Sequence, residues 1–193
     1  MVQYTLWDTN VDLNLAKATF PTEDEMKAMD DNFSGIVSEH GYFESPIHGK
    51  KLHFRKLLPP SGTETKGVFV FQHGIMAECS MSHKEDGELF KLALLAKMIT
   101  EAGYIMYSLD MIGHGFSEGT RFYIPNSDWT VNRDDFKSFA LFASKEEKPG
   151  LPIFLGGESY GACLAIHVSF LWMNEPESGP SNFKGICILA PGK

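Results

Sequence analysis

Short apolar runs alternate with longer segments of helical periodicity over most of the chain. Continuous apolar runs, which are typical of buried strands, occur at Gly67–Phe71, Ile105–Leu109, Pro152–Leu155 and Gly185–Ala190. Between them, apolar residues recur at helical spacing at residues 85–102, 129–144 and 160–173. Strands that alternate with helices in this way favour an α/β fold with a mostly parallel sheet.

The part of the chain that precedes these elements follows a different pattern. Tyr42–Ser45 and Lys51–Arg55 are strand-like runs separated by Pro46–Gly49, which predicts an antiparallel hairpin. The residues before the hairpin are acidic and weakly patterned. We therefore expect an N-terminal arm at residues 1–40, followed by one domain at residues 41–193.

Length and charge narrow the classes of protein to consider. A chain of 193 residues with 43% hydrophobic residues is long enough for one well-buried core. Its net charge of −8 argues against a nucleic-acid partner or an anionic membrane surface. The sequence shows neither a transmembrane segment nor a secretory leader pattern, so we expect a cytoplasmic protein.

The three cysteines and the pair Asp110 and His114 are candidates for thiol or metal chemistry. Cys79, Cys163 and Cys187 lie far apart among apolar neighbours, so we expect buried free thiols rather than disulfides. Asp110 and His114 are four residues apart at the end of a predicted strand, but no further ligands occur at metal-site spacings. The expectation is that the protein holds no metal and no cofactor.

The segment Gly157-Glu158-Ser159-Tyr160-Gly161 has the form G-x-S-x-G between a predicted strand and a predicted helix. That context is the one a nucleophile elbow requires, with Ser159 at the tip of the turn. Gly157 and Gly161 suit it because a tight strand-to-helix turn leaves no room for Cβ atoms. A phosphate-binding loop is the alternative, but neither standard glycine motif fits and Glu158 would repel the anion.

An elbow of this kind needs two backbone donors for an oxyanion. One is the N–H of Tyr160, directly after the serine, and the other comes from the loop after the strand Gly67–Phe71. Within that loop we assign the second donor to Ile75, which follows His73 and Gly74. His73 itself is interpreted as an anchor for the loop rather than as a catalytic base.

Four stretches together resemble one known family: Gln72-His73-Gly74, DMIGHGFSEG at residues 110–119, LPIFLGGESYGA at residues 151–162, and FKGICILAP. Their order and spacing are similar to those of α/β-hydrolases close to monoacylglycerol lipases and lysophospholipases, over about residues 41 to 191. The resemblance implies that Ser159 is the nucleophile and that Ile75 and Tyr160 form the oxyanion hole. It also implies a small, lipid-like acyl ester as substrate.

The chain departs from that family after the elbow. A triad in this fold runs Ser, then Asp or Glu, then His, but the only acidic residues after Ser159 are Glu175 and Glu177. The only later histidine, His167, is eight residues along the predicted helix, about 12 Å away along its axis. We therefore expect an α/β-hydrolase core truncated after the sixth strand, with an exposed apolar edge that favours self-association.

Three functions remain open at this point. The first is an ester hydrolase that forms an acyl-enzyme on Ser159. The second is a catalytically inactive protein that keeps the elbow as a scaffold for binding or regulation. The third is an amidase or peptidase on the same fold, because fold and nucleophile do not determine the leaving group.

Overall fold

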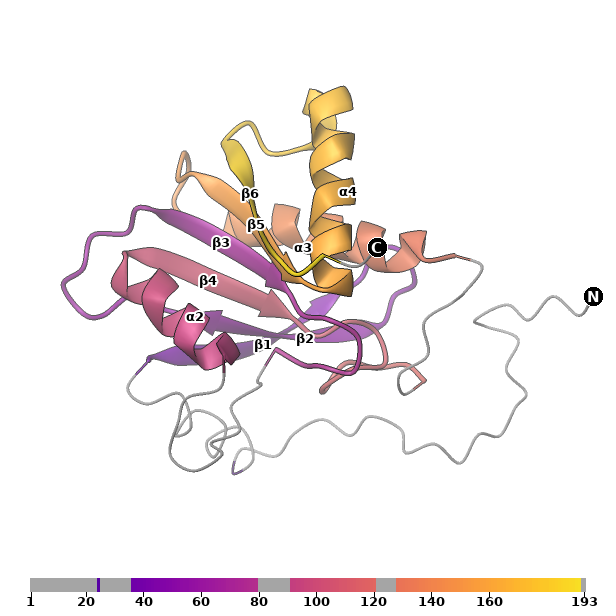
Figure 1. Cartoon of the computed structure of the whole chain (residues 1–193), viewed down its shortest axis with the longest axis horizontal. Coiled ribbons are helices and arrows are strands. Elements are labelled where there is room, and N and C mark those ends of the chain that lie inside the picture. Colours follow the sequence, from indigo (N-terminus) through magenta and orange to yellow (C-terminus); the bar gives the residue numbers. More distant parts are fainter. Residues whose placement is uncertain (1–23, 25–35, 80–90, 121–127, 192–193) are drawn as a thin grey trace, which may run out of the picture.

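The structure is a computed structural model that describes residues 24, 36–79, 91–120 and 128–191 (Figure 1). A six-stranded sheet with the order β1-β2-β4-β3-β5-β6 forms its centre. The strands are β1 (Ser38–Glu44), β2 (Lys51–Leu57), β3 (Gly67–Gln72), β4 (Tyr104–Leu109), β5 (Ile153–Glu158) and β6 (Phe183–Leu189). β1 and β2 form an antiparallel hairpin, and β4, β3, β5 and β6 are parallel. The predicted α/β class, with its N-terminal hairpin and mostly parallel sheet, is confirmed.

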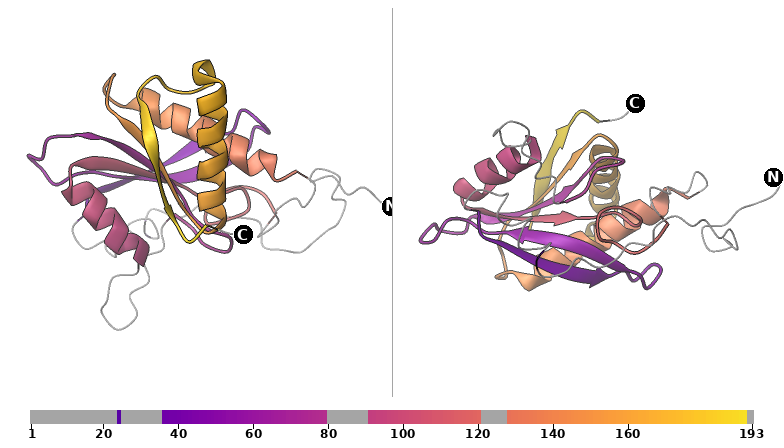
Figure 2. Two further views of the ribbon diagram at one scale, coloured as in Figure 1. Left: turned by 45° about the horizontal axis from the view of Figure 1, so that its top comes forward. Right: turned by 90° about the horizontal axis from the view of Figure 1, so that it is seen from below.

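Helices cover both faces of this sheet. The longer ones are α2 (Lys91–Glu101), α3 (Thr130–Glu146) and α4 (Tyr160–Asn174), and a short 3-10 helix, η1 (Pro176–Ser178), follows. α2 lies on one face, and α3 and α4 lie side by side on the other (Figures 1 and 2). The start of the helix predicted at residues 85–102 falls outside the described residues. None of the described helices is long and apolar enough to span a membrane.

The two faces of the sheet are filled by alternate residues of each strand. In β3, Val68 and Val70 belong to the core shared with α3 and α4, whereas Phe69 and Phe71 belong to the core under α2. This alternation follows from the period of two in a strand. Each buried side chain of this kind contributes about 1.5–3 kcal/mol to the free energy of folding. The apolar run of β3 is continuous because its side chains pack against helices on both faces of the sheet.

The hairpin is attached to α3 through a buried carboxylate, that of Asp135. The hydroxyl of Ser45 donates a hydrogen bond to Oδ1 of Asp135, and Nε2 of His48 donates to Oδ2 at 2.9 Å. Ser45 and Asp135 are both buried. β1 begins at Ser38, so the last three residues of the expected arm, 38–40, belong to the sheet.

The exposure of the cysteines corrects one expectation. Cys79 is buried, but Cys163 is half-buried and Cys187 is exposed, so the prediction of three buried thiols was wrong for two of them. The physical reason for Cys187 is its place on β6, an edge strand that pairs with β5 and has no strand on its other side among the described residues. Its neighbour Leu189 is 44% exposed for the same reason.

α4 begins in direct main-chain contact with the end of β3. A Cβ atom at Gly161 would lie 2.1 Å from the carbonyl oxygen of Gln72 and 2.5 Å from that of His73. A Cβ at Gly157 would lie 2.3 Å from the carbonyl oxygen of Gly161. No side chain fits at either position, because the atoms it would meet are backbone atoms that cannot turn away. The two glycines thus allow the helix to start against the sheet.

We expect Asp135→Asn to lower the free energy of unfolding by about 1–3 kcal/mol, because an amide cannot accept both bonds from Ser45 and His48. Urea denaturation measures this change. Asp134→Asn is the matched control, since Asp134 pairs with Arg133 near the surface and should contribute less than about 1 kcal/mol. Equal effects of the two substitutions would contradict the attachment of the hairpin through Asp135.

We expect Gly161→Ala to destabilise the fold by more than about 2 kcal/mol, because its Cβ collides with the Gln72 carbonyl. Elsewhere in a helix the same change stabilises a protein by about 0.5–1 kcal/mol. The sign of the change in unfolding free energy therefore shows whether the Cβ atom at position 161 meets the Gln72 carbonyl. Thermal and urea unfolding measure it. A neutral or stabilising result would mean that α4 does not start against β3.

Candidate active site

Ser159 stands at the junction of β5 and α4 with an unusual backbone conformation. Its φ of 53° and ψ of −119° differ from those of both a strand and a helix. A non-glycine residue held at positive φ stores about 1–3 kcal/mol of strain, and such residues cluster at functional sites. The side chain is exposed, and its hydroxyl makes no capping bond to α4. The arrangement therefore presents a serine hydroxyl at the tip of a tight turn.

The start of α4 supplies hydrogen-bond donors beside this hydroxyl. The carbonyl oxygen of Ser159 accepts the N–H groups of Ala162 at 3.1 Å and Cys163 at 3.2 Å. The N–H groups of Tyr160 and Gly161 precede these bonds, where a helix leaves its first donors without intrahelical acceptors. The positive end of the helix dipole lies at the same place. An anion formed on a group bonded to Ser159 would meet these donors.

The side chain of Tyr160 connects α4 to α3. Nδ2 of Asn132 donates a hydrogen bond to the Tyr160 hydroxyl at 3.3 Å. Burial raises the pKa of the Tyr160 hydroxyl above its usual value, so the group is neutral at physiological pH. Its contacts hold the residue after Ser159 against the core.

The loop that follows β3 lies directly against Ser159. A Cβ atom at Gly74 would be 3.1 Å from Cβ of Ser159 and 3.7 Å from its Oγ. The chain then turns, with the N–H of Ala77 donating to the carbonyl of Gly74 at 3.3 Å and Met76 at a φ of 63°. The N–H of Ile75, in the middle of this turn, donates to no carbonyl in the described part of the chain. The structure thus brings the predicted loop residues next to the predicted nucleophile.

His73 is buried at the start of this loop with both ring nitrogens engaged. Nδ1 donates to the carbonyl of Gly74 at 2.6 Å, and Nε2 accepts the N–H of Met111 at 3.1 Å. Burial lowers the pKa of His73 to about 4, although the charge of Asp110 opposes that shift. The imidazole is therefore neutral and links the loop after β3 to the loop after β4.

Asp110, at the end of β4, has the most heavily bonded carboxylate of this region. Its Oδ1 accepts the N–H of Cys79 at 2.6 Å, and its Oδ2 accepts the N–H of Phe116 at 3.1 Å and Nδ1–H of His53 at 2.8 Å. Burial alone would raise the pKa of Asp110, but the hydrogen bond from His53 and its electrostatic interaction with the carboxylate outweigh that effect. The nearby imidazole of His73 and the N–H of Cys79 act in the same sense, and the pKa of Asp110 lies well below its usual range.

A chain of hydrogen bonds connects this carboxylate to a buried cation. Arg55 donates to Nε2 of His40 at 3.1 Å, and Nδ1 of His40 lies 2.9 Å from Nε2 of His53. Because Nδ1 of His53 bonds Asp110, a hydrogen on Nδ1 of each imidazole lets both rings donate toward the carboxylate. Arg55 and Asp110 are both fully buried, so the two imidazoles join charges of opposite sign inside the fold.

Ligand atoms of His53, Cys79 and Asp110 lie within 4.8 Å of one another, which is close enough for a metal site. Hydrogen bonding accounts for the same proximity. Nδ1 of His53 lies 2.8 Å from Oδ2 of Asp110 and 3.4 Å from Sγ of Cys79, and Asp110 accepts two further backbone N–H groups. We therefore interpret the group as a hydrogen-bonded cluster. Of the pair named from the sequence, Asp110 belongs to this group and His114 does not; Nδ1 of His114 bonds the carbonyl oxygen of Ile112 at 3.0 Å.

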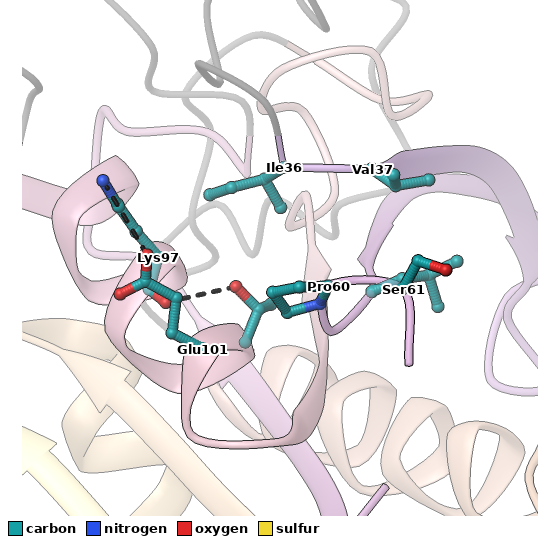
Figure 3. Close-up of a pocket in the computed structure, with 8 residues that line it drawn as sticks. Ile36, Val37, Pro60, Ser61, Lys97 and Glu101 are labelled. Atoms are coloured by element: carbon teal, nitrogen blue, oxygen red, sulfur yellow. Dashed lines mark hydrogen bonds and ion pairs between the residues drawn. The ribbon is translucent and has the colours of Figure 1, made fainter. Parts of the chain in front are cut away.

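A cavity of about 200 Å³ lies near the start of β1, the end of β2 and the C-terminal end of α2. Its lining comes from the C-terminal half of α2, including Lys97 and Glu101, and from Ile36, Val37, Leu58, Pro60 and Ser61 (Figure 3). Lys97 and Glu101 form an ion pair of 3.8 Å at its rim. α2 ends where β4 begins, whereas Ser159 follows the end of β5, so this cavity is remote from the elbow.

Sequence reasoning identified the elbow but missed the cluster beneath the loop. The position of Asp110 could have been noticed in the sequence, since this residue directly follows a buried strand and precedes a glycine-rich stretch. No sequence pattern indicates that His53 contacts Asp110, because 57 residues separate the two and only the pairing of the hairpin with the sheet brings them together.

Comparison with known proteins identifies the family of the chain. The sequence model of the family described as Serine aminopeptidase, S33 matches residues 63–192. Caffeoylshikimate esterase of Arabidopsis thaliana is 27% identical over 157 residues, which are 81% of this chain and 42% of that protein. Monoglyceride lipase of Homo sapiens is 30% identical over 138 residues, which are 72% of this chain and 39% of that protein.

Solved structures support the same fold. The structure of esterase Est22 superimposes with a TM-score of 0.63 at 14% identity, covering 89% of this chain and 53% of that one. A carboxyl esterase from Bacillus coagulans gives a TM-score of 0.57 at 15% identity, over 79% of this chain and 44% of that one. The chain thus spans about two fifths of the length of the curated relatives described above. It belongs to the α/β-hydrolases of the serine aminopeptidase S33 family, in the branch that includes the monoglyceride lipases.

Proposed function

We propose that these residues form the nucleophile half of a serine ester hydrolase. Oγ of Ser159 attacks the acyl carbonyl, and the N–H groups of Ile75 and Tyr160 stabilise the oxyanion of the tetrahedral intermediate. The ester C–O bond then breaks, the alcohol leaves with the proton taken from the serine, and water hydrolyses the acyl-enzyme. The observation that carries this proposal is the strained, exposed conformation of Ser159 at the start of α4, with Gly74 against it.

Apolar residues beside the elbow favour a lipid-like acyl group. Ile75 is 50% exposed and Met76 is 73% exposed, both in the turn that follows Gly74. Exposed apolar side chains next to a polar reaction centre suit a substrate with a hydrocarbon chain next to an ester. Relatives named monoglyceride lipase point in the same direction. The substrate class we propose is therefore a monoacylglycerol or a lysophospholipid.

Neither His73 nor His167 suits the role of the general base. Both nitrogens of His73 are engaged, and its lowered pKa leaves it a weak base. His167 is on α4, about 12 Å along the axis from Ser159, with its ring 4.6 Å from that of Trp129. We propose that the base and its carboxylate partner lie outside these 193 residues, in keeping with the greater length of the relatives.

Ser159→Ala tests the nucleophile, with p-nitrophenyl butyrate as substrate, in the 193-residue chain and in any longer product of the same gene. A longer product that holds the base should lose at least about 10³-fold in kcat, while the 193-residue chain alone should change little because it lacks the base. Ser169→Ala is the matched control, since Ser169 is a buried serine of the same helix bonded to the carbonyl of Ile166.

Two outcomes would contradict the proposal. Equal turnover by Ser159→Ala and the wild-type longer product would remove Ser159 from the mechanism. Faster cleavage of an amino-acid p-nitroanilide than of the ester would favour a peptidase, the activity named in the description of the matching family.

The neutral state of His73 predicts a pH-dependent stability. Its pKa of about 4 lies below the value of 6.5 for a free side chain. Between these two pH values the imidazole is protonated in the unfolded chain and neutral in the folded protein. The contribution is complete above about pH 6.5 and is lost as the pH falls toward 4. Between pH 7 and pH 5, the free energy of unfolding should fall by about 2 kcal/mol more in the wild type than in His73→Gln. Urea denaturation at both pH values measures this, and parallel slopes would show that His73 is protonated in the fold.

A further inference from the structure

The loop that carries Ile75 is attached to the rest of the fold at both of its ends. At its start, His73 accepts the N–H of Met111, the second residue beyond β4. At its far end, the N–H of Cys79 donates to the carboxylate of Asp110 at 2.6 Å. Between these two points the chain makes the turn with Met76 at positive φ. The position of the Ile75 N–H is therefore decided by where these two attachments hold the loop.

Asp110 is the centre of this arrangement because it also holds the loop after β4. The N–H of Phe116 donates to its carboxylate, and the hydroxyl of Ser117 donates to its carbonyl oxygen at 2.7 Å. A Cβ atom at Gly115 would lie only 2.0 Å from Oδ2 of Asp110, at a φ of 46°. The loop after β4 thus closes over the carboxylate so tightly that no side chain fits at position 115.

A buried carboxylate can hold two loops only while it stays charged and keeps its orientation. The hydrogen bond from His53 supplies the orientation, and His53 is itself held by His40, to which Arg55 donates. An ionised carboxylate accepts several N–H groups at once, and such charge-assisted bonds are about twice as strong as neutral ones. An amide at the same position has one oxygen acceptor and adds donors where N–H groups already point.

We propose that Asp110 is a positioning residue for the oxyanion hole, which it serves by holding the N–H of Cys79 and with it the loop that carries Ile75. Among the described residues Asp110 makes no hydrogen bond to Ser159 and acts through the loop. The inference rests on the proposed function, because the placement of the Ile75 N–H matters only if Ser159 forms a tetrahedral intermediate. Oxyanion donors act through prior placement, so a loosened loop lowers the rate of acyl transfer.

The test is Asp110→Asn in a gene product that hydrolyses p-nitrophenyl butyrate, with rates expressed per folded molecule as measured by circular dichroism. Loss of a well-placed oxyanion donor costs about 10²–10³-fold in kcat, so a displaced one should cost about 10- to 100-fold, with KM changed less than about threefold. Asp135→Asn is the matched control. It also removes a buried carboxylate with two side-chain partners, but at the hairpin, so it should lower stability and leave kcat within about twofold.

Hydrogen exchange gives a second measurement that needs no active protein. In the wild type, the amide of Cys79 should exchange at least about tenfold more slowly than that of Ile75, because the first is bonded to Asp110 and the second has no acceptor among the described residues. In Asp110→Asn the Cys79 amide should lose this protection. If the variant does not fold, the wild-type exchange rates alone decide whether the attachment exists.

The outcomes separate the inference from the proposed function. If hydrolysis depends on Ser159 while Asp110→Asn matches the wild type per folded molecule, the inference is overturned and the function stands. Equal exchange of Cys79 and Ile75 in the wild type also overturns it. If Ser159→Ala hydrolyses the ester as fast as the wild type, the proposed function fails, and the positioning role for Asp110 fails with it.

Discussion

The contact of main chain against main chain, where α4 begins beside the end of β3, is the constraint on which the site depends. A Cβ atom at Gly161 would lie 2.1 Å from the carbonyl oxygen of Gln72, so the helix can begin this close to β3 only without a side chain there. The turn between β5 and α4 is then too tight for ordinary backbone angles, and Ser159 takes the strain at a φ of 53°. The same closeness sets Gly74 against Ser159. A strained serine, a helix N-terminus and the following loop meet because of this one approach.

Buried carboxylates hold the loops of this fold in place, whereas apolar packing holds the strands. Asp135 holds the hairpin on α3, and Asp110 holds the segments that follow β3 and β4. Loops carry backbone N–H groups that no ladder satisfies, so an anion with several acceptor positions suits them. Arg55, which is also fully buried, is linked to Asp110 through the hydrogen bonds of two imidazoles. A buried charge without polar partners would cost several kcal/mol, and these hydrogen bonds provide such partners.

The sequence predicted the elements well because their signals are local. Apolar runs located β3 to β6, and the glycines around Ser159 marked the strand-to-helix turn. What it missed depends on contacts between distant segments. His53 reaches Asp110 only because β2 pairs with β4, and no pattern within the hairpin indicates that. The apolar neighbours of Cys187 predict a buried strand, yet they do not say whether another strand pairs with the outer side of β6.

The backbone of Ser159 is also tied to the margin of the sheet. Its N–H donates to the carbonyl of Leu189, the last residue of β6, at 3.0 Å, and the next residue, Ala190, has a φ of 42°. The least enclosed strand of the sheet therefore shares a hydrogen bond with the proposed nucleophile. The backbone position of Ser159 therefore depends on how the end of β6 is held, as well as on the close approach of α4 to β3.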